Sequence, residues 1–129
     1  MASAMLNLGL VVVGGGIGAG MRHVVNMGAM RLLGAGYPWG TMIINITGSF
    51  VMGAFIELLA RRFGASNELR LFVATGILGG YTTFSSFSLD FAALWERGAL
   101  GPALAYVLVS VVGGILALFA AFWLVRNLA

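Results

Sequence analysis

The chain contains no cysteine and no lysine, and both absences narrow what it can do. Without cysteine there is no disulfide framework, no thiolate metal site and no thiol nucleophile. One histidine and four acidic residues make a catalytic metal site built from side chains improbable. The sequence also presents no nucleophile–base pair, so we expect that the protein is not an enzyme.

Charge of either sign is scarce as well. Only 9% of the 129 residues are charged and 60% are hydrophobic, whereas a soluble domain carries about 25% charged residues. The seven arginines lie singly or in pairs at the ends of apolar runs and form no basic stripe for nucleic acid. The composition therefore predicts an integral membrane protein.

Four apolar stretches can be marked, at about 5–25, 39–59, 69–94 and 102–125. Each is long enough to cross a hydrocarbon layer of about 30 Å. The connections between them are too short to hold a soluble domain. We therefore expect an all-α membrane protein with one transmembrane domain over residues 1–129 and four transmembrane helices.

The third stretch contains a segment that is a poor helix interior. Gly79 and Gly80 are adjacent, and the residues after them are rich in hydroxyl side chains. The glycine pair is typical of a helix C-terminus and the Thr/Ser run of a new N-cap. We expect a break near residues 79–83, in the middle of the membrane. An ordinary glycine kink is the alternative.

A break at that depth frees backbone groups that cost several kcal/mol each if they face lipid. They must be buried in protein or bind something. Carbonyl groups at a helix C-terminus are the negative end of a dipole and suit a hard cation such as Na⁺.

Polar and aromatic side chains accompany the break. Phe84 and Phe87 are three apart and share a helix face, and their ring edges, which are electropositive, can favour an anion without trapping it. Asn45 offers two N–H donors at mid-depth, and we favour a functional role for it. Polar residues also recur every four positions on the second and fourth stretches, where helix–helix hydrogen bonding is an equal alternative: Thr41, Asn45 and Ser49, and Tyr106, Ser110 and Gly114.

The arginines are distributed almost evenly between the two expected ends of the bundle. Four lie on the side of the termini and three on the opposite side: Arg61, Arg62, Arg70 and Arg126, against Arg22, Arg31 and Arg97. An arginine excess normally sets the orientation of a membrane protein. A weak bias that still suffices is one interpretation. We favour the other, in which the chain inserts both ways and forms an antiparallel, dual-topology homodimer.

Three motifs together resemble those of the Fluc family of fluoride channels, also called CrcB. The most specific is GGYTTFSSFS at 79–88, and GGGIGAGMR at 14–22 and GT…NITG at 40–48 support it. The resemblance covers essentially the whole chain. It departs from the family at Ser86, where threonine is common, and at Gly114, where some members carry a hydroxyl.

The resemblance implies a dual-topology homodimer with two fluoride pores in a bacterial inner membrane, as a multi-pass protein. It implies a structural Na⁺ at the dimer centre, held by the backbone carbonyls of Gly79 and Thr82. It places Asp90 at a pore mouth. The residues that it assigns to the pore are Asn45, Thr83, Phe84, Ser86, Phe87, Tyr106 and Ser110.

The resemblance, together with the absence of charge at mid-membrane, favours a fluoride-selective channel that exports fluoride passively and relieves its toxicity. The main alternative is a small dual-topology, proton-coupled exporter of the small multidrug resistance type, which needs a carboxylate well inside the membrane. All four acidic residues lie near the ends of the apolar stretches, which weighs against it. A non-transporting assembly subunit is a further alternative, but it gives the break no purpose.

Overall fold

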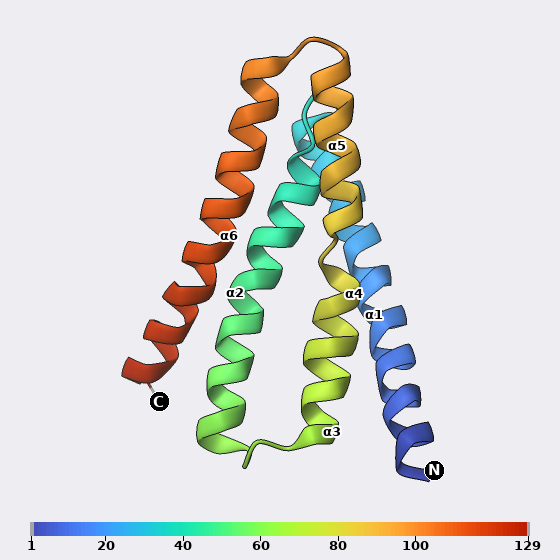
Figure 1. Ribbon diagram of the computed structural model, residues 1–129, viewed down its shortest axis with the longest axis vertical. Coiled ribbons are helices and arrows are strands. Elements are labelled where there is room, and N and C mark those ends of the chain that lie inside the picture. Colours follow the sequence, from blue (N-terminus) through green and yellow to red (C-terminus); the bar gives the residue numbers. More distant parts are fainter. Residues whose placement is uncertain (1, 129) are drawn as a thin grey trace.

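The computed structural model describes residues 2–128, and every regular element in that range is a helix (Figure 1). The three long helices are α1 (Ala2–Leu33), α2 (Trp39–Arg62) and α6 (Leu100–Leu128). Between α2 and α6 the chain forms four shorter segments: α3 (Asn67–Arg70), the π-helical η1 (Leu71–Leu78), α4 (Gly79–Tyr81) and α5 (Phe84–Glu96).

Three helices are long and apolar enough to cross a membrane: Ser3–Leu33, Trp39–Arg62 and Leu100–Leu128. The prediction of an all-α, multi-pass membrane protein is therefore confirmed. The third predicted stretch is divided at Thr82 and Thr83, and neither part alone has the length of a membrane span. A fourth crossing stays a prediction, as does the single transmembrane domain.

The first helix is longer than the predicted span of 5–25. It continues to Leu33 and ends where Gly34 takes a positive φ of 84°. Asn26, the polar residue at which the apolar run ends, is accommodated because its side chain packs directly against Gly40 of α2. As a result Arg22 lies well inside α1, about 16 Å before its end.

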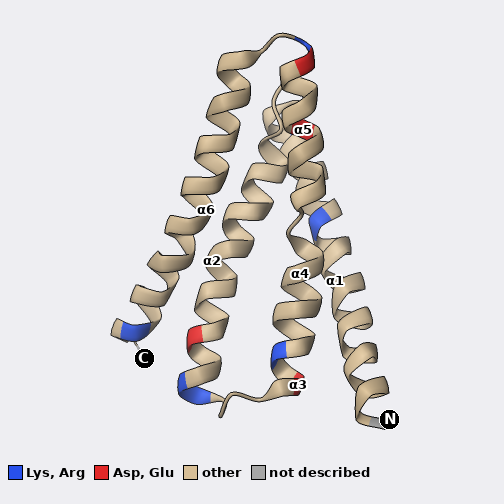
Figure 2. Ribbon diagram, viewed as in Figure 1, with Lys and Arg blue, Asp and Glu red and all other residues tan. Residues whose placement is uncertain are grey.

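The helices run alternately up and down (Figure 1). The two ends of the chain and the α2–α3 connection lie at one end of the bundle, and the α1–α2 and α5–α6 connections lie at the other. Helix α2 packs mainly against α6, and α1 packs mainly against η1 and α4. Most charged residues lie towards the two ends, and the middle of α2 and of α6 carries none, whereas α1 carries a basic residue about half-way up the bundle (Figure 2).

Glycines bring the backbone of α1 against that of η1 and α4. A Cβ added to Gly14 would lie 2.5 Å from the carbonyl oxygen of Phe72, and one added to Gly80 would lie 2.5 Å from that of Gly15. A Cβ on Gly18 would overlap the carbonyl of Ile77. Gly14 and Gly18 are therefore packing residues, whereas a Cβ on Gly20 would meet nothing within 4 Å.

The predicted helix end at Gly79–Gly80 is wrong by about two residues. Gly79 has helical angles (φ −64°, ψ −36°), and the helix continues to Tyr81. The pair serves close packing, because Gly80 touches α1. The phenol of Tyr81 then ties this turn to α2 through a 3.0 Å hydrogen bond with the hydroxyl of Thr47.

We predict that Gly18→Ala destabilises the protein by about 1–3 kcal/mol, the usual cost of overpacking, because backbone atoms must separate to admit the methyl group. Gly9→Ala on the same helix is the matched control, since a Cβ at Gly9 meets nothing within 4 Å. Thermal unfolding in detergent measures both. Equal midpoints for the two variants would contradict the backbone contact.

Candidate functional site

The polypeptide that follows α4 leaves helical conformation for two residues before α5 begins. Thr82 (φ −77°, ψ 156°) and Thr83 (φ −150°, ψ 113°) are extended between α4 and α5. The Thr83 hydroxyl accepts a 3.2 Å hydrogen bond from the backbone N–H of Ser86 and so caps α5. The predicted use of the hydroxyl run as an N-cap is confirmed, and Thr83 is the residue that performs it.

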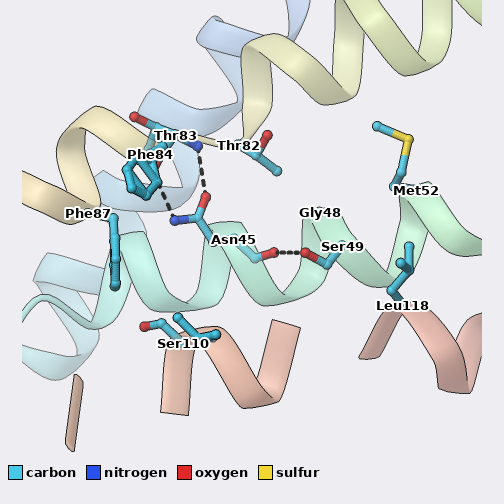
Figure 3. Close-up of a pocket in the computed structure, with 11 residues that line it drawn as sticks. Asn45, Gly48, Ser49, Met52, Thr82, Thr83, Phe84, Phe87, Ser110 and Leu118 are labelled. Carbon is cyan, nitrogen blue, oxygen red and sulfur yellow. Dashed lines mark hydrogen bonds between the residues drawn. The ribbon is translucent and has the colours of Figure 1, made fainter. Parts of the chain in front are cut away.

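Asn45 of α2 holds the interruption in place from the side (Figure 3). Its Oδ1 accepts a 2.8 Å hydrogen bond from the N–H of Thr83, and its Nδ2 donates a 3.0 Å bond to the carbonyl of Thr83. One amide side chain thus satisfies both backbone groups of an extended residue. In a region without water these groups would otherwise cost several kcal/mol each.

Two hydrogen bonds at the interruption, one to Asn45 and one to the Thr83 hydroxyl, change the partners of the carbonyls of Gly79 and Thr82. In a continuous helix, these carbonyls would accept from the N–H groups of Thr83 and Ser86, four residues on. Those N–H groups donate instead to Asn45 Oδ1 and to Thr83 Oγ1. The two carbonyls that the resemblance assigns to Na⁺ are therefore the ones whose helical donors are diverted.

A groove with a volume of about 340 Å³ runs along the interruption, between α2, α5 and α6 (Figure 3). No side chain that lines it is charged. The lining residues are Asn45, Gly48, Ser49, Met52, Thr82, Thr83, Phe84, Phe87, Ser110, Val111 and Leu118.

The two phenylalanines differ in their surroundings. Phe84 is 75% exposed in the single chain. Phe87 is half-buried, with its ring centroid 5.8 Å from that of Phe84 and 5.1 Å from that of Tyr106. Phe87 is thus fixed against the core, whereas Phe84 projects from it.

Ser110 presents an unused hydroxyl. It is only 8% exposed, and its Oγ has no hydrogen-bond partner among the described residues. A buried polar atom without a partner is costly and rare in a native structure. Because Ser110 lines the groove, its hydroxyl can donate to a guest there.

The structure brings most of the predicted pore residues to this groove, but not all. Ser86 lines a separate cavity, which Thr83 shares. Tyr106 is fully buried in the core, where its hydroxyl donates a 3.0 Å bond to Asp90. Asp90 itself lines a third pocket, near Arg97.

Several lining residues were not assigned to the site from the sequence. Ser49 belongs to the polar stripe of α2, for which helix–helix hydrogen bonding was an equal alternative, and Met52 and Leu118 lie among apolar neighbours that carry no signal. Arg22 lines the cavity that contains Ser86, and the sequence did not predict this position either. Arg22 lies at this depth because α1 extends to Leu33, whereas the apolar pattern predicted a helix that ends near residue 25.

We predict that Asn45→Leu destabilises the protein by about 1–3 kcal/mol for each Thr83 group left without a partner. Asn127→Leu is the control, because that amide is exposed and bonds only to Trp123 of its own helix. Unfolding in detergent gives the stabilities, and hydrogen exchange at the Thr83 amide reports the clamp directly. Slow exchange at that amide in Asn45→Leu would refute the clamp.

Comparison with known proteins gives a family and close relatives. A family model described as CrcB-like protein, Camphor Resistance (CrcB), matches residues 9–122. A Mesorhizobium japonicum protein named fluoride-specific ion channel FluC is 71% identical over 124 residues, which cover 96% of this chain and 99% of that protein. Proteins of the same name from Chelativorans sp. and Agrobacterium fabrum are 60% and 55% identical over the same shares. The chain therefore belongs to the CrcB family.

Proposed function

We propose that this chain forms a fluoride-selective ion channel that exports fluoride passively across a bacterial membrane and so relieves fluoride toxicity. The relatives named fluoride-specific ion channel match it almost end to end. The observation that carries the proposal is the groove beside the helix interruption. It combines polar donors with apolar walls and has no charged side chain in its lining.

Uncharged donors suit the passage of a small anion. Moving a bare anion from water into an apolar medium costs tens of kcal/mol, so the path must replace its water with other donors. Asn45 keeps one amide N–H beyond the one it gives to Thr83, and the hydroxyl of Ser110 has no partner within residues 2–128. Because neither group is charged, the anion is held weakly enough to leave, as conduction requires.

The phenylalanine rings add a second kind of contact. Ring edges carry the positive part of the aromatic quadrupole and attract an anion without forming a strong bond. Phe84 and Phe87 both line the groove next to Asn45 (Figure 3). They supply an apolar wall that keeps water out and an edge that partly replaces it.

The proton-coupled exporter is not favoured, because it needs a titratable carboxylate on the transport path. Glu57 pairs with Arg126 at 2.6 Å and with Arg61 at 3.2 Å. Asp90 accepts the hydrogen bond from Tyr106. Neither lines the groove, and a non-transporting assembly subunit would leave the groove without a use.

We propose that the active unit is an antiparallel, dual-topology homodimer. In each copy, residues 67–96 form a fourth membrane span, which is third in chain order and is broken near its middle. Two features support it. The side chain of Phe84 is largely exposed beside the interruption, and a second copy of the chain would cover it. Arginines lie at both ends of the bundle, four in α3 and the last turns of α2 and α6, and Arg31 and Arg97 at the other end. Arg22 lies inside α1, so the predicted count of four against three becomes four against two, and both ends keep arginines.

We also propose a structural Na⁺ at the centre of that dimer, bound by the carbonyls of Gly79 and Thr82 from each copy. The diverted helical donors at these two carbonyls support the assignment. Carbonyl oxygens of unwound helices are suitable ligands for Na⁺ in membranes. The ion would supply positive charge that neutralises the exposed helix end.

If the protein is a fluoride channel, liposomes that contain the purified protein should release fluoride. They should release little chloride, and the fluoride rate should not depend on a pH gradient. Phe87→Ile should lower the fluoride rate about tenfold, equivalent to about 1.4 kcal/mol, because the ring edge is lost. Phe119→Ile, an exposed residue of α6 outside the groove, is the control. Absence of fluoride efflux from the wild type, or strict coupling to protons, would refute the channel.

If the proposed dimer is correct, the protein in detergent should have the mass of a dimer, and this dimer should require Na⁺. Light scattering should give the mass of two copies in NaCl and a loss of dimer when N-methylglucamine replaces Na⁺. Since the chain has no cysteine, Asn127→Cys can report orientation through an impermeant maleimide. Labelling of half the molecules from outside supports dual topology, whereas all or none would contradict it.

A further inference from the structure

On the α6 side of the groove, the series of hydroxyl side chains ends at Ser110. Tyr106, Ser110 and Gly114 lie one helical turn apart and are all buried. The first two carry hydroxyls and Gly114 carries no side chain. Beyond Ser110, towards Met52 and Leu118, α6 therefore offers an anion no side-chain donor within the lining of the groove.

A hydroxyl from the facing helix occupies this position. Ser49 of α2 lines the same groove as Ser110 (Figure 3). Its Oγ lies 3.5 Å from where a Cβ on Gly114 would be. A Cβ on Gly114 would thus be in ordinary van der Waals contact with the Ser49 hydroxyl, so the two positions share one part of the groove.

The Ser49 hydroxyl can change its partner at low cost. It now donates a 2.7 Å hydrogen bond to the carbonyl of Asn45. That carbonyl lies inside α2, where the backbone N–H of Ser49 also donates to it. If the hydroxyl rotates towards a guest, the carbonyl keeps its helical partner and no backbone group is left unsatisfied.

We propose that Ser49 is a fluoride ligand, which receives the ion from Ser110 and continues the polar path on α2 where α6 has only Gly114. The proposal rests on the proposed function. Asn45, Ser110 and Ser49 then form a chain of neutral donors along the groove, each able to release the ion to the next. Several weak sites in series are what conduction needs.

The test measures fluoride efflux from liposomes for Ser49→Ala against Ser88→Ala. Ser88 is exposed outside the groove, and its hydroxyl makes the same kind of bond, to the carbonyl of Phe84 four residues earlier. Ser49→Ala should lower the rate about tenfold and raise the fluoride concentration at half-maximal flux. Ser88→Ala should leave both unchanged.

The double variant Ser49→Ala/Gly114→Ser distinguishes a ligand from a structural role. It returns a hydroxyl to the same part of the groove from α6, where it cannot restore the side-chain bond of Ser49 to Asn45 within α2. Recovery of the flux supports the ligand role. A folded double variant that stays as slow as Ser49→Ala overturns it.

A second pair of variants tests the same role if the double variant is not stable. If the double variant does not elute as a folded protein, Ser49→Thr and Ser49→Val replace it, because they share a shape and differ in the hydroxyl. Equal rates for these two overturn the proposal, and a faster threonine variant supports it. Wild-type efflux that equals Ser49→Ala efflux overturns only the role of Ser49, whereas no wild-type fluoride efflux overturns the channel itself.

Discussion

The arrangement depends on one interaction, the two hydrogen bonds between the side chain of Asn45 and the backbone of Thr83. A chain that leaves the helix inside an apolar protein must satisfy the groups that it exposes. Asn45 does this for both groups of Thr83, and the Thr83 hydroxyl does it for the first turn of α5. The interruption is therefore a stable feature of the fold and not a local irregularity.

Close backbone packing holds the two sides of the interruption in position. Gly14 and Gly18 let α1 lie directly on η1, and Gly80 does the same at Gly15. On the other side, Gly53 lets α2 approach α6, since a Cβ there would lie 2.6 Å from the carbonyl of Leu118. Such contacts need small residues, because lipid provides little hydrophobic driving force between helices.

The chemistry of the groove follows from how this chain distributes its few charges. Apart from Arg22 inside α1, they lie mostly towards the ends of the bundle, and Glu57 is neutralised there by two arginines (Figure 2). The middle of the groove is left to amide, hydroxyl and aromatic groups. A path of this kind stabilises an anion without a fixed positive charge that would retain it.

The sequence by itself determined the membrane class, the approximate positions of α2 and α6, and a departure from helix near residues 79–83, which the structure limits to Thr82 and Thr83. Hydropathy and the Gly/Thr/Ser composition are local properties and need no partner to be recognised. The importance of Asn45 could also be predicted, because an amide in an apolar helix is unusual in itself.

Only the tertiary structure decided how these residues are used. It showed that Asn45 clamps Thr83, that Gly80 packs against Gly15 and does not end the helix, and that Tyr106 lies in the core beside Asp90. It also placed Ser49 opposite Gly114. Each of these pairs joins residues from different helices. Their contacts depend on the distance and rotation between packed helices, which the periodicity of one segment does not contain.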